Sequence, residues 1–366
     1  MSHVLLREIL DVSSLEELVK TGLVRMRPHE SAGLFILDYS AQAQYARNWT
    51  PEISTSRGLI TSGPLSDPKT YVVARPFAKF GNVGEHGPNQ PFAELPLRLP
   101  FEATEKMDGS LAIAYFDGEK IALSTRGSFH SDQAKAASAL WARRFGDVVV
   151  PENVTLLFEY IAPWNRVIVA YEQEDLVFLA ALDNRTGADV EFTQWPGKRV
   201  RVFSGTDDFT ELVDIARSDP NPTDEGFVVR FVPEDVTQPS VRVKLKFSEY
   251  LRVHRLMSKI SSVTIWEHLS EGKPLDEMLD GVPDEFYEFI QDTVSELTGA
   301  YEALLAAAAA VRDQVRGLDR KVAAEIISKQ TTADKSLAFG LLDGLDMSKQ
   351  AWKLVRPKHS VPKYGQ

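Results

Sequence analysis

The sequence predicts an α+β protein that ends in an all-α part, and three observations lead to this prediction. Strand-like segments dominate as far as about residue 255, whereas period-3.6 spacing of apolar residues dominates from Trp266 to Leu354. The chain has 366 residues, 43% of them hydrophobic and 25% charged, which suits two globular domains. We place the boundary near residues 255–262 and expect domains over residues 1–257 and 258–366.

Local signals place the elements of the first domain. Ser13 and Glu16 form a capping-box pattern and Gly22 is a typical stop, so a helix is expected near residues 13–21. The Asp-Gly pair in residues 116–119 predicts a hairpin turn. Further helices are expected near residues 131–145 and 209–216, and strands at 33–37, 111–115, 121–124, 156–160, 167–170 and 227–231.

Composition and charge exclude several classes of protein. The chain has no cysteine, which rules out disulfides, thiolate metal sites and thiol catalysis and fits a reducing cytoplasm. No uninterrupted apolar run reaches the about 20 residues that span a bilayer, so no membrane partner is expected. The net charge of -11 argues against a protein that coats nucleic acid, although a cleft that holds a few phosphates needs only local positive charge.

The C-terminal end departs from this acidic balance. Its last 20 residues contain no Asp or Glu and carry five cations, at Lys349, Lys353, Arg356, Lys358 and Lys363. These residues form either a solvated helix end or a surface that contacts phosphates.

A Lys-x-Asp-Gly motif, Lys106 to Gly109, lies between two predicted strands. By average residue usage such a motif occurs by chance in about one chain in ten of this length. Four further elements follow it in order, each of which alone is also typical of a turn, a strand end or an amphipathic strand. They are Ser124-Thr125-Arg126-Gly127-Ser128-Phe129, Phe158-Glu159-Tyr160, Asp224-Glu225-Gly226-Phe227-Val228-Val229 and Val243-Lys244-Leu245-Lys246, the last with both lysines on one face.

This ordered set resembles motifs I, Ia, III, IV and V of the covalent nucleotidyltransferase superfamily, which comprises ATP-dependent DNA ligases, RNA ligases and mRNA capping enzymes. Within it the chain is most similar to the phage RNA ligase 1 type. The segments that carry this resemblance are Arg57-Gly58-Leu59, residues 75–82, residues 127–134, residues 158–169 and Tyr250 at its spacing after Lys246. The resemblance implies a ligase adenylation (nucleotidyltransferase) domain of antiparallel sheets with flanking helices over residues 1–257, and an all-helical domain over residues 258–366 that recognises RNA or tRNA.

The resemblance also implies a three-step reaction. Lys106 attacks the α-phosphate of ATP to form lysyl-AMP, AMP moves to an RNA 5′-phosphate, and a 3′-hydroxyl then displaces AMP and seals the strand. Only the neutral amine attacks phosphorus, and the ordinary pKa of lysine is about 10.4. Lys244, Lys246 and Arg126 would lower that pKa and neutralise the phosphate if they converge on the site.

Other residues receive roles by the same resemblance. Asp108 is expected to hold the ribose or orient Lys106, and Gly109 to let the backbone approach the nucleotide. Glu159 is expected to accept from a ribose hydroxyl or from metal-bound water. Glu225 is the candidate for Mg²⁺ or Mn²⁺, held through water, and Tyr250 for stacking on adenine.

Four more residues are assigned to the ATP pocket. Glu105 precedes the nucleophile, and Arg57, Arg75 and Lys79 are expected to meet the β- and γ-phosphates. For Arg75 and Lys79 an exposed loop charge is the alternative. The family often has lysine at the position of Arg126. The positive charge is kept, but arginine and lysine differ in geometry, so the contact that the family's lysine makes cannot be assigned to Arg126.

Two alternatives to an RNA ligase stay open at this point. A DNA ligase or capping guanylyltransferase shares the catalytic motifs but is followed by an OB-fold, which the helical pattern after Lys259 disfavours; labelling by GTP would favour such an enzyme. A non-catalytic RNA end-binding protein would be expected to lose Lys106 or the two motif V lysines. The expected partners are ATP, RNA with 5′-phosphate and 3′-hydroxyl ends and nicked tRNA, for a monomer in the cytoplasm of a bacterium or phage-infected cell.

Overall fold

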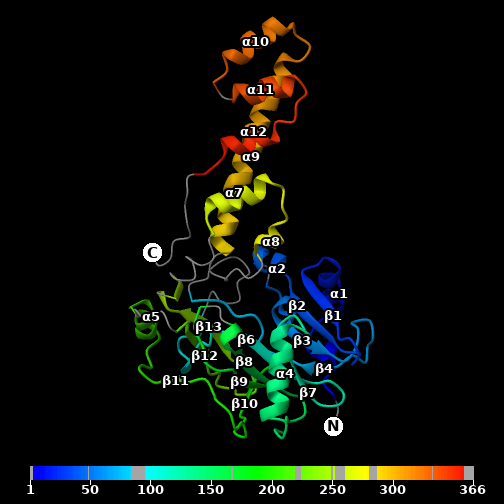
Figure 1. Ribbon diagram of the computed structural model, residues 1–366, viewed down its shortest axis with the longest axis vertical. Coiled ribbons are helices and arrows are strands. Elements are labelled where there is room, and N and C mark those ends of the chain that lie inside the picture. The colour runs from blue at the N-terminus through cyan, green and yellow to red at the C-terminus, as the bar shows by residue number, and fades with distance from the viewer. Residues whose placement is uncertain are drawn as a thin grey trace. The chain divides into compact units, whose positions relative to one another are not determined.

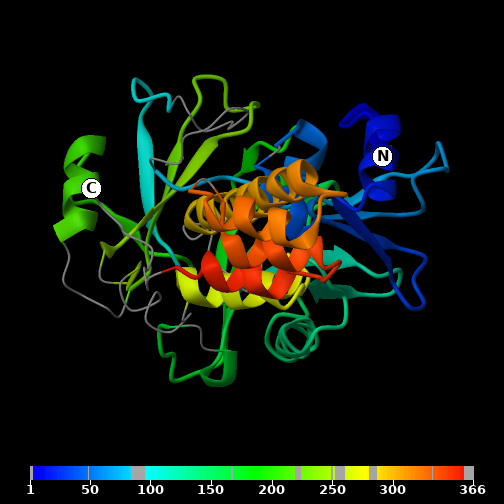
Figure 2. The same ribbon diagram turned by 90° about the horizontal axis from the view of Figure 1, so that it is seen from above.

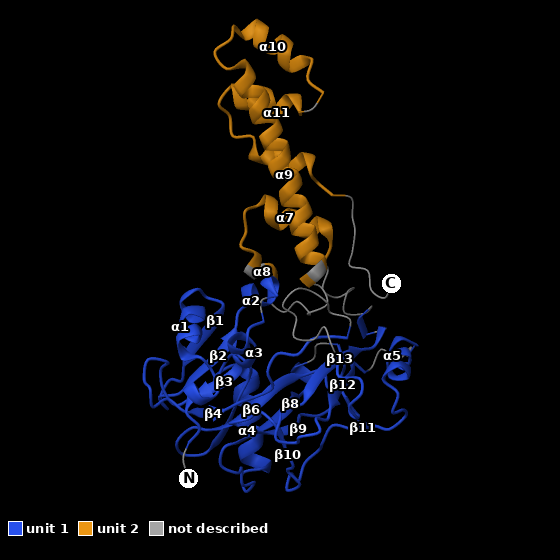
Figure 3. Cartoon of the chain, turned by 180° about the vertical axis from the view of Figure 1, so that it is seen from behind, with its two compact units in different colours: residues 1–254 blue, residues 255–366 orange. Residues whose placement is uncertain are grey.

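A computed structural model of the chain describes residues 3–47, 49–83, 95–165, 168–218, 224–248, 250–251, 260–279, 287–331 and 333–357. The chain divides into two compact units, Met1–His254 and Arg255–Gln366 (Figure 3). The domain boundary expected from the sequence, between residues 257 and 258, lies within residues 252–259, which are outside the described residues, so it stays a prediction. The predicted α+β class with a helical C-terminal part is confirmed: unit 1 combines sheets and helices, and every element described in unit 2 is a helix.

Three sheets form unit 1, and all of their described strand pairs are antiparallel (Figure 1). Sheet 1 has the order β1 (Val24–Pro28), β2 (Phe35–Tyr39), β3 (Arg57–Thr61), β4 (Val72–Ala74). Sheet 2 has the order β10 (Asp189–Val190), β9 (Asp175–Asp183), β8 (Val154–Ile161), β6 (Ser110–Phe116), β7 (Ile121–Ser124). Sheet 3 has the order β11 (Val202–Phe203), β5 (Phe101–Glu105), β12 (Gly226–Phe231), β13 (Val241–Lys246).

Helices cover these sheets. The longest helix of unit 1, α4, begins after Ser131, whose hydroxyl accepts from the Ala134 amide as an N-cap. It buries Leu140 and Trp141 against Phe158 of sheet 2, and full burial of such a side chain contributes about 1.5–3 kcal/mol. The helices with described bounds in unit 1 are η1 (Leu6–Glu8), α1 (Val12–Lys20), α2 (Ala41–Ala46), α3 (Pro51–Thr55), α4 (Asp132–Arg144), η2 (Pro163–Asn165) and α5 (Phe209–Ser218).

Some local predictions shift by a residue or two. Helix α1 is capped by Asp11, whose carboxylate accepts from the Ser13 and Ser14 amides, so the expected capping box at Ser13 is wrong. Strand β2 begins at Phe35 because Gly33 has a φ of 67° and turns the chain. The hairpin between β6 and β7 is confirmed, with Gly118 at a φ of 105°.

The strand expected at residues 167–170 is wrong in its described part, Ile168 to Ala170. The backbone amides of Ile168 and Val169 donate to the Asp108 carboxylate, at 2.8 and 2.7 Å, and not to a neighbouring strand. An apolar run alone does not show whether its backbone amides will donate to a neighbouring strand or to a side chain. The hydrogen bonds to Asp108 could therefore not be predicted from the sequence pattern.

Hydrophobic clusters join the layers of unit 1. Sheets 1 and 2 share a core in which Ile36 and Ile60 pack with Ile113 and Leu157. The other face of sheet 1 packs against α1 and α3. Sheet 3 packs on α5 through Leu212 and belongs to a separate cluster. Sheets 2 and 3 therefore have their own cores, and the side chains that each directs toward the other remain available to line a cavity.

Unit 2 is built around one long helix, α9, along which α11 and α12 lie (Figures 1 and 2). Ala308, Val311 and Val315 of α9 contribute to the core of this unit. Phe289–Val315 also has the length and the mean hydropathy, 1.2, of a membrane-crossing helix, with 17% of that window buried; the expectation of no membrane partner thus stays a prediction. Its described helices are α7 (Ser262–Ser270), α8 (Leu275–Leu279), α9 (Tyr287–Val315), α10 (Arg320–Ser328), α11 (Lys335–Leu342) and α12 (Ser348–Leu354).

Candidate active site

A cavity of about 1060 Å³ lies in unit 1, lined by side chains of both sheet 2 and sheet 3. Alternate residues of a strand point to the same face, and the register of sheet 3 sets Thr104, Val228 and Lys244 in one row across the cavity wall. Its volume is at the upper end of the range for ligand pockets, about 300–1,000 Å³. The cavity is therefore large enough for a nucleotide.

Lys106 lies at the end of β5, at one end of this cavity. Its backbone amide donates to the Gly226 carbonyl at 2.8 Å, which ties the nucleophile candidate to the start of β12. Only glycine fits at position 226, because its φ is 140° and a Cβ there would lie 2.2 Å from the Leu245 carbonyl oxygen. The Lys106 Nζ lies 2.5 Å from Oε2 of Glu225, and its side chain is 19% exposed.

Glu225 is a buried carboxylate between two lysines. Its second oxygen, Oε1, lies 3.1 Å from the Lys246 Nζ. Burial alone would raise the pKa of Glu225, but the charges and hydrogen bonds of Lys106 and Lys246 bring it below its ordinary value. Glu225 is thus an anion that contacts two lysine side chains, and the structure brings Lys106, Lys246 and Glu225 together.

Glu159, on β8, is the second carboxylate near Lys106. It accepts from the Gly109 amide at 3.0 Å and lines the cavity. Burial raises its pKa to about 7, the charge of Glu225 adds to this rise, and Lys106 opposes it. Glycine is required at position 109, because a Cβ would lie 2.5 Å from the Tyr160 carbonyl oxygen. Gly109 also lines the cavity, so its expected close approach to a nucleotide stays a prediction.

Asp108 and Tyr250 are hydrogen-bonded to each other and are not among the residues that line the cavity. The Asp108 carboxylate, 4% exposed, accepts from the amides of Ile168 and Val169 and from the Tyr250 hydroxyl, at 3.0 Å. Both of its oxygens are used by protein partners, which does not favour a contact with a ribose; the alternative that Asp108 orients Lys106 stays a prediction. Tyr250 is 2% exposed and absent from the cavity wall, so its ring is not placed to stack on a base.

Three cations line the cavity near Lys106. Arg57 opens β3, and its Nη1 is buried with no hydrogen-bond partner among the residues that the structure describes. Arg126 follows β7; its Nε lies 3.2 Å from Asp38 Oδ1, and its Nη1 donates to the Tyr39 hydroxyl. The Lys244 Nζ lies 5.6 Å from the centre of the Phe80 ring. Arg57, Arg126 and Lys244 thus bring positive charge to the wall that contains Lys106.

Arg75 and Lys79 do not line the cavity, which corrects their assignment to ATP phosphates. The Arg75 Nη1 donates to the carbonyls of Asn184, at 3.3 Å, and Arg185, at 2.6 Å, so the side chain holds the turn after β9. Lys79 is 7% exposed, with its Nζ 5.1 Å from the centre of the Trp49 ring. The sequence pattern showed that Arg75 and Lys79 are cations, but not that they contact other parts of the protein.

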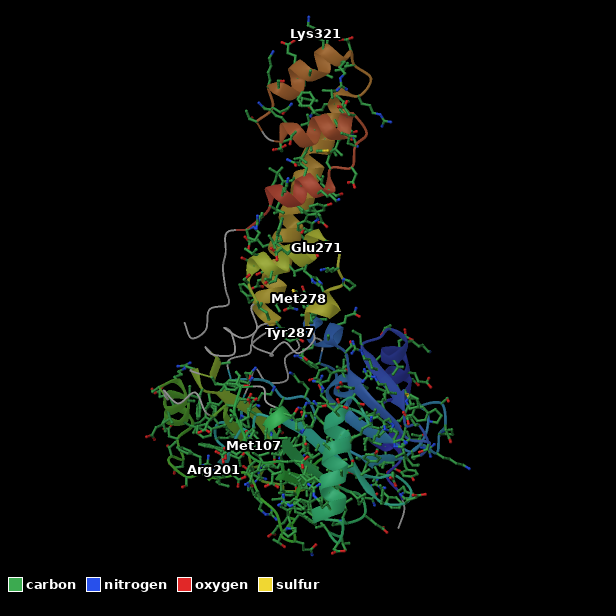
Figure 4. The ribbon with its side chains drawn as sticks, in the orientation of Figure 1. Met107, Arg201, Glu271, Met278, Tyr287 and Lys321 are labelled. Carbon is green, nitrogen blue, oxygen red and sulfur yellow. The ribbon has the colours of Figure 1, made fainter. Side chains whose placement is uncertain are left out.

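Glu105 lines the cavity and forms an ion pair that the sequence did not suggest. Its Oε2 lies 2.7 Å from the Arg201 Nε, and its amide donates to the Arg201 carbonyl. Figure 4 labels Met107 and Arg201 in this part of unit 1. The Glu105 carboxylate is paired at the rim, where Arg201 is 75% exposed.

The opposite end of the cavity carries charged residues that sequence reasoning missed. Asp189 of β10 is paired with Arg242, lies 3.6 Å from the Arg230 Nη1, and accepts from the Ser240 hydroxyl at 2.6 Å. Arg230 also lies 3.5 Å from Glu102. The alternation of Arg242 with Lys244 and Lys246 on β13 was the one available signal, since all three must share a face.

Glu159 and Glu225 are the residues that fit a divalent cation. The structure describes no cluster of three or more His, Cys, Asp or Glu side chains that could enclose a metal. Mg²⁺ is commonly held by one or two carboxylates together with water and substrate phosphates, so two carboxylates beside a phosphate pocket fit it. Their coupling is visible in the pKa of Glu159, which the Glu225 charge raises further after burial has raised it.

Comparison with known proteins bears on the family of the chain. Residues 55–250, more than half of the chain, match the model of a family described as RNA ligase. A candidate RNA ligase of Thermovibrio ammonificans is 30% identical over 204 residues, 52% of each chain. The RNA ligase 1 of bacteriophage TS2126 is 35% identical over 123 residues, 30% of each chain. The chain thus spans about half, or less, of the length of these relatives.

Among solved structures, an RNA ligase mutant of Naegleria gruberi with ATP and Mn is similar over 43% of this chain and 51% of that one, with a TM-score of 0.33 and 16% identity. The same ligase with pyrophosphate has the same score and identity. A likeness of this extent leaves the family assignment to the sequence match over residues 55–250.

Proposed function

Because the chain belongs to this RNA ligase family, of the phage RNA ligase 1 type, we propose that it is an ATP-dependent RNA ligase that carries AMP on Lys106. The observation that supports this most is the placement of Lys106 at the end of a nucleotide-sized cavity, 2.5 Å from a carboxylate that a second lysine shares. The antiparallel sheets 2 and 3 then form the nucleotidyltransferase core of unit 1.

The residues around Lys106 suggest how its amine becomes reactive. In the free protein Glu225 pairs with Lys106 as an ammonium ion, which cannot attack phosphorus until a proton leaves. Of the two carboxylates that act on Lys106, Glu159 has a pKa of about 7 and can take up that proton near neutral pH. The freed amine then attacks the α-phosphate of ATP, the new N–P bond replaces the bond to pyrophosphate, and lysyl-AMP results.

In this scheme the cations of the cavity wall bind the phosphates of ATP. Arg57 has a buried nitrogen ready to donate, and Lys244 and Arg126 face the same cavity. They neutralise oxygen charge that grows as pyrophosphate leaves. Glu159 and Glu225 would hold Mg²⁺ or Mn²⁺, largely through water, and the ion would supply further charge neutralisation at the phosphates.

Incubation with α-labelled ATP and Mg²⁺ tests the first step. The wild type should retain label through denaturation, whereas Lys106→Ala should retain less than about one part in a thousand, since no other nucleophile replaces the amine. Equal labelling of both proteins would contradict the assignment of Lys106. Labelling by GTP in preference to ATP would instead indicate a capping-type guanylyltransferase.

The later steps would use RNA with a 5′-phosphate and a 3′-hydroxyl, and unit 2 is our candidate for recognising a nicked tRNA. The exposed Lys349 and Lys353 on or near α12 support this role. Arg356 is less available, because its guanidinium lies 5.0 Å from the centre of the Trp266 ring. Lys349→Gln with Lys353→Gln should slow sealing of nicked tRNA and spare sealing of a plain oligonucleotide. If both substrates respond alike, unit 2 does not select tRNA.

A further inference from the structure

Four arginines gather around one carboxylate beside the cavity mouth. Asp38, on β2, is 7% exposed, and the arginines that act on it are Arg25, Arg27, Arg57 and Arg126. Burial raises the pKa of Asp38 although all four guanidinium groups act to lower it. Four arginines around one carboxylate leave a local excess of positive charge, in a chain whose net charge is -11. Like charges repel, so such a group is expected where an anion binds.

Two of these arginines project from an edge strand. Arg25 and Arg27 lie on β1, which ends sheet 1, and both are exposed. They share a face of the strand about 7 Å apart, a spacing close to that of successive phosphates in a single strand. The Arg25 side chain is exposed, so its guanidinium donors are accessible to a ligand.

The same group continues into the cavity. Arg27 donates to the Gly127 carbonyl, and Gly127 and its neighbour Arg126 line the cavity that contains Lys106. Arg57 lines it as well, and its buried Nη1 has no hydrogen-bond partner among the described residues. A chain of guanidinium groups thus leads from the exposed edge of sheet 1 to the wall next to the nucleophile.

We propose that Arg25 and Arg27, continuous with Arg57 and Arg126, bind backbone phosphates of the RNA strand whose 5′-phosphate receives AMP. This inference rests on the proposed function. The guanidinium fork suits phosphate, to which it donates two parallel hydrogen bonds. Arg25 and Arg27 do not line the cavity, whereas Arg57 and Arg126 do. A nucleotide in the cavity would therefore contact Arg57 and Arg126, and a polyanion that extends out of the cavity would contact Arg25 and Arg27.

The test compares two double variants of the full-length protein. Arg25→Gln with Arg27→Gln removes the exposed pair, and Arg7→Gln with Arg217→Gln removes two exposed arginines of unit 1 that lie outside the group. Binding of a 5′-phosphorylated single-stranded RNA is measured by fluorescence anisotropy over a range of salt concentrations. Transfer of AMP from pre-labelled protein to the same RNA is followed in a single turnover.

We expect the Arg25/Arg27 variant to bind RNA at least about tenfold more weakly at low salt, with the slope of log affinity against log salt reduced by about 1.4, since each cation contributes about 0.7 for a single strand. AMP transfer should fall in parallel, while labelling by ATP, a step without RNA, changes less than twofold. The Arg7/Arg217 variant should match the wild type in all three measurements.

Two results would overturn the proposal. An unchanged salt slope would show that these arginines do not hold RNA, and an equal loss of ATP labelling and RNA transfer would assign them to the triphosphate. Failure of the proposed function looks different, because the wild type itself would then take no label from ATP. The anisotropy measurement needs no catalysis and decides the RNA contact even in that case.

Discussion

The two ends of the cavity in unit 1 use charge in opposite ways. At the Asp189 end the charged groups are paired with each other. Asp189 forms ion pairs with Arg242 and Arg230 and accepts a hydrogen bond from Ser240, and the Arg242 side chain is only 9% exposed. At the Lys106 end Glu225 is matched in this way, by Lys106 and Lys246, but two other groups are not. Glu159 has a pKa of about 7, and Arg57 keeps a buried nitrogen without a partner among the described residues.

This difference separates structural charge from functional charge. Buried ion pairs that complete each other stabilise one arrangement and leave nothing for a ligand, whereas incomplete ones lower stability and favour binding of an anion or transfer of a proton. Asp108 belongs with the first kind although it lies inside the motif, since backbone amides and Tyr250 use both its oxygens. Motif membership and chemical role are therefore separate questions.

The largest expected effect follows from Glu225→Gln, which tests the functional end. The change removes the anion that holds Lys106 and Lys246 side by side, and electrostatic groups of this kind contribute about 100- to 1000-fold to rate. We expect AMP labelling to slow by about that factor. Glu17→Gln, at an exposed pair with Lys20, is the control and should leave the rate unchanged. A loss under tenfold would contradict a functional role for Glu225.

The matching change at the structural end is Asp189→Asn. It leaves Arg242 and Arg230 without their counter-charge, so the free energy of unfolding should fall by about 2–4 kcal/mol. AMP labelling of the folded protein should change less than threefold. Denaturant unfolding and the labelling rate measure the two effects. The comparison between the ends breaks down if labelling fails while the stability stays the same.

Glu159→Gln should remove a pH dependence of stability. The raised pKa means that between about pH 4.5 and pH 7 folded Glu159 binds a proton that the unfolded chain releases, so wild-type stability falls as pH rises through this window. The variant lacks this loss. Its free energy of unfolding relative to wild type should therefore increase by about 1–3 kcal/mol from pH 5 to pH 8. If the free energy of unfolding of the two proteins changed in parallel with pH, the pKa of Glu159 would not be raised in the folded protein.

The smallest effect is expected from Tyr250→Phe. Loss of the hydroxyl bond to the buried Asp108 should cost about 1–2 kcal/mol of stability, with the KM for ATP within twofold of wild type. Tyr301→Phe, on α9 of unit 2, is the control, because that ring stacks on Trp352 without a hydroxyl bond to any described residue. If stability holds and KM rises, the Tyr250 ring contacts the nucleotide after all.

Several features could be read from the sequence because they depend on neighbours along the chain. The position of α4 near residues 131–145, the Asp-Gly hairpin after β6 and the shared face of Lys244 and Lys246 are local consequences of helix propensity, turn geometry and strand alternation. The order of the five motifs likewise led to Lys106, Glu159 and Glu225, which the fold places together.

The tertiary structure decided which charges meet. Nothing in the sequence pairs Arg75 with the carbonyls of Asn184 and Arg185, or turns the amides of Ile168 and Val169 toward Asp108. Such contacts join residues about 60 to 110 positions apart, and they depend on sheet register and burial. The sequence by itself determined the residue types available for the chemistry, and folding decided which of them are left to a ligand, because a polar group becomes functional only where the protein does not already satisfy it.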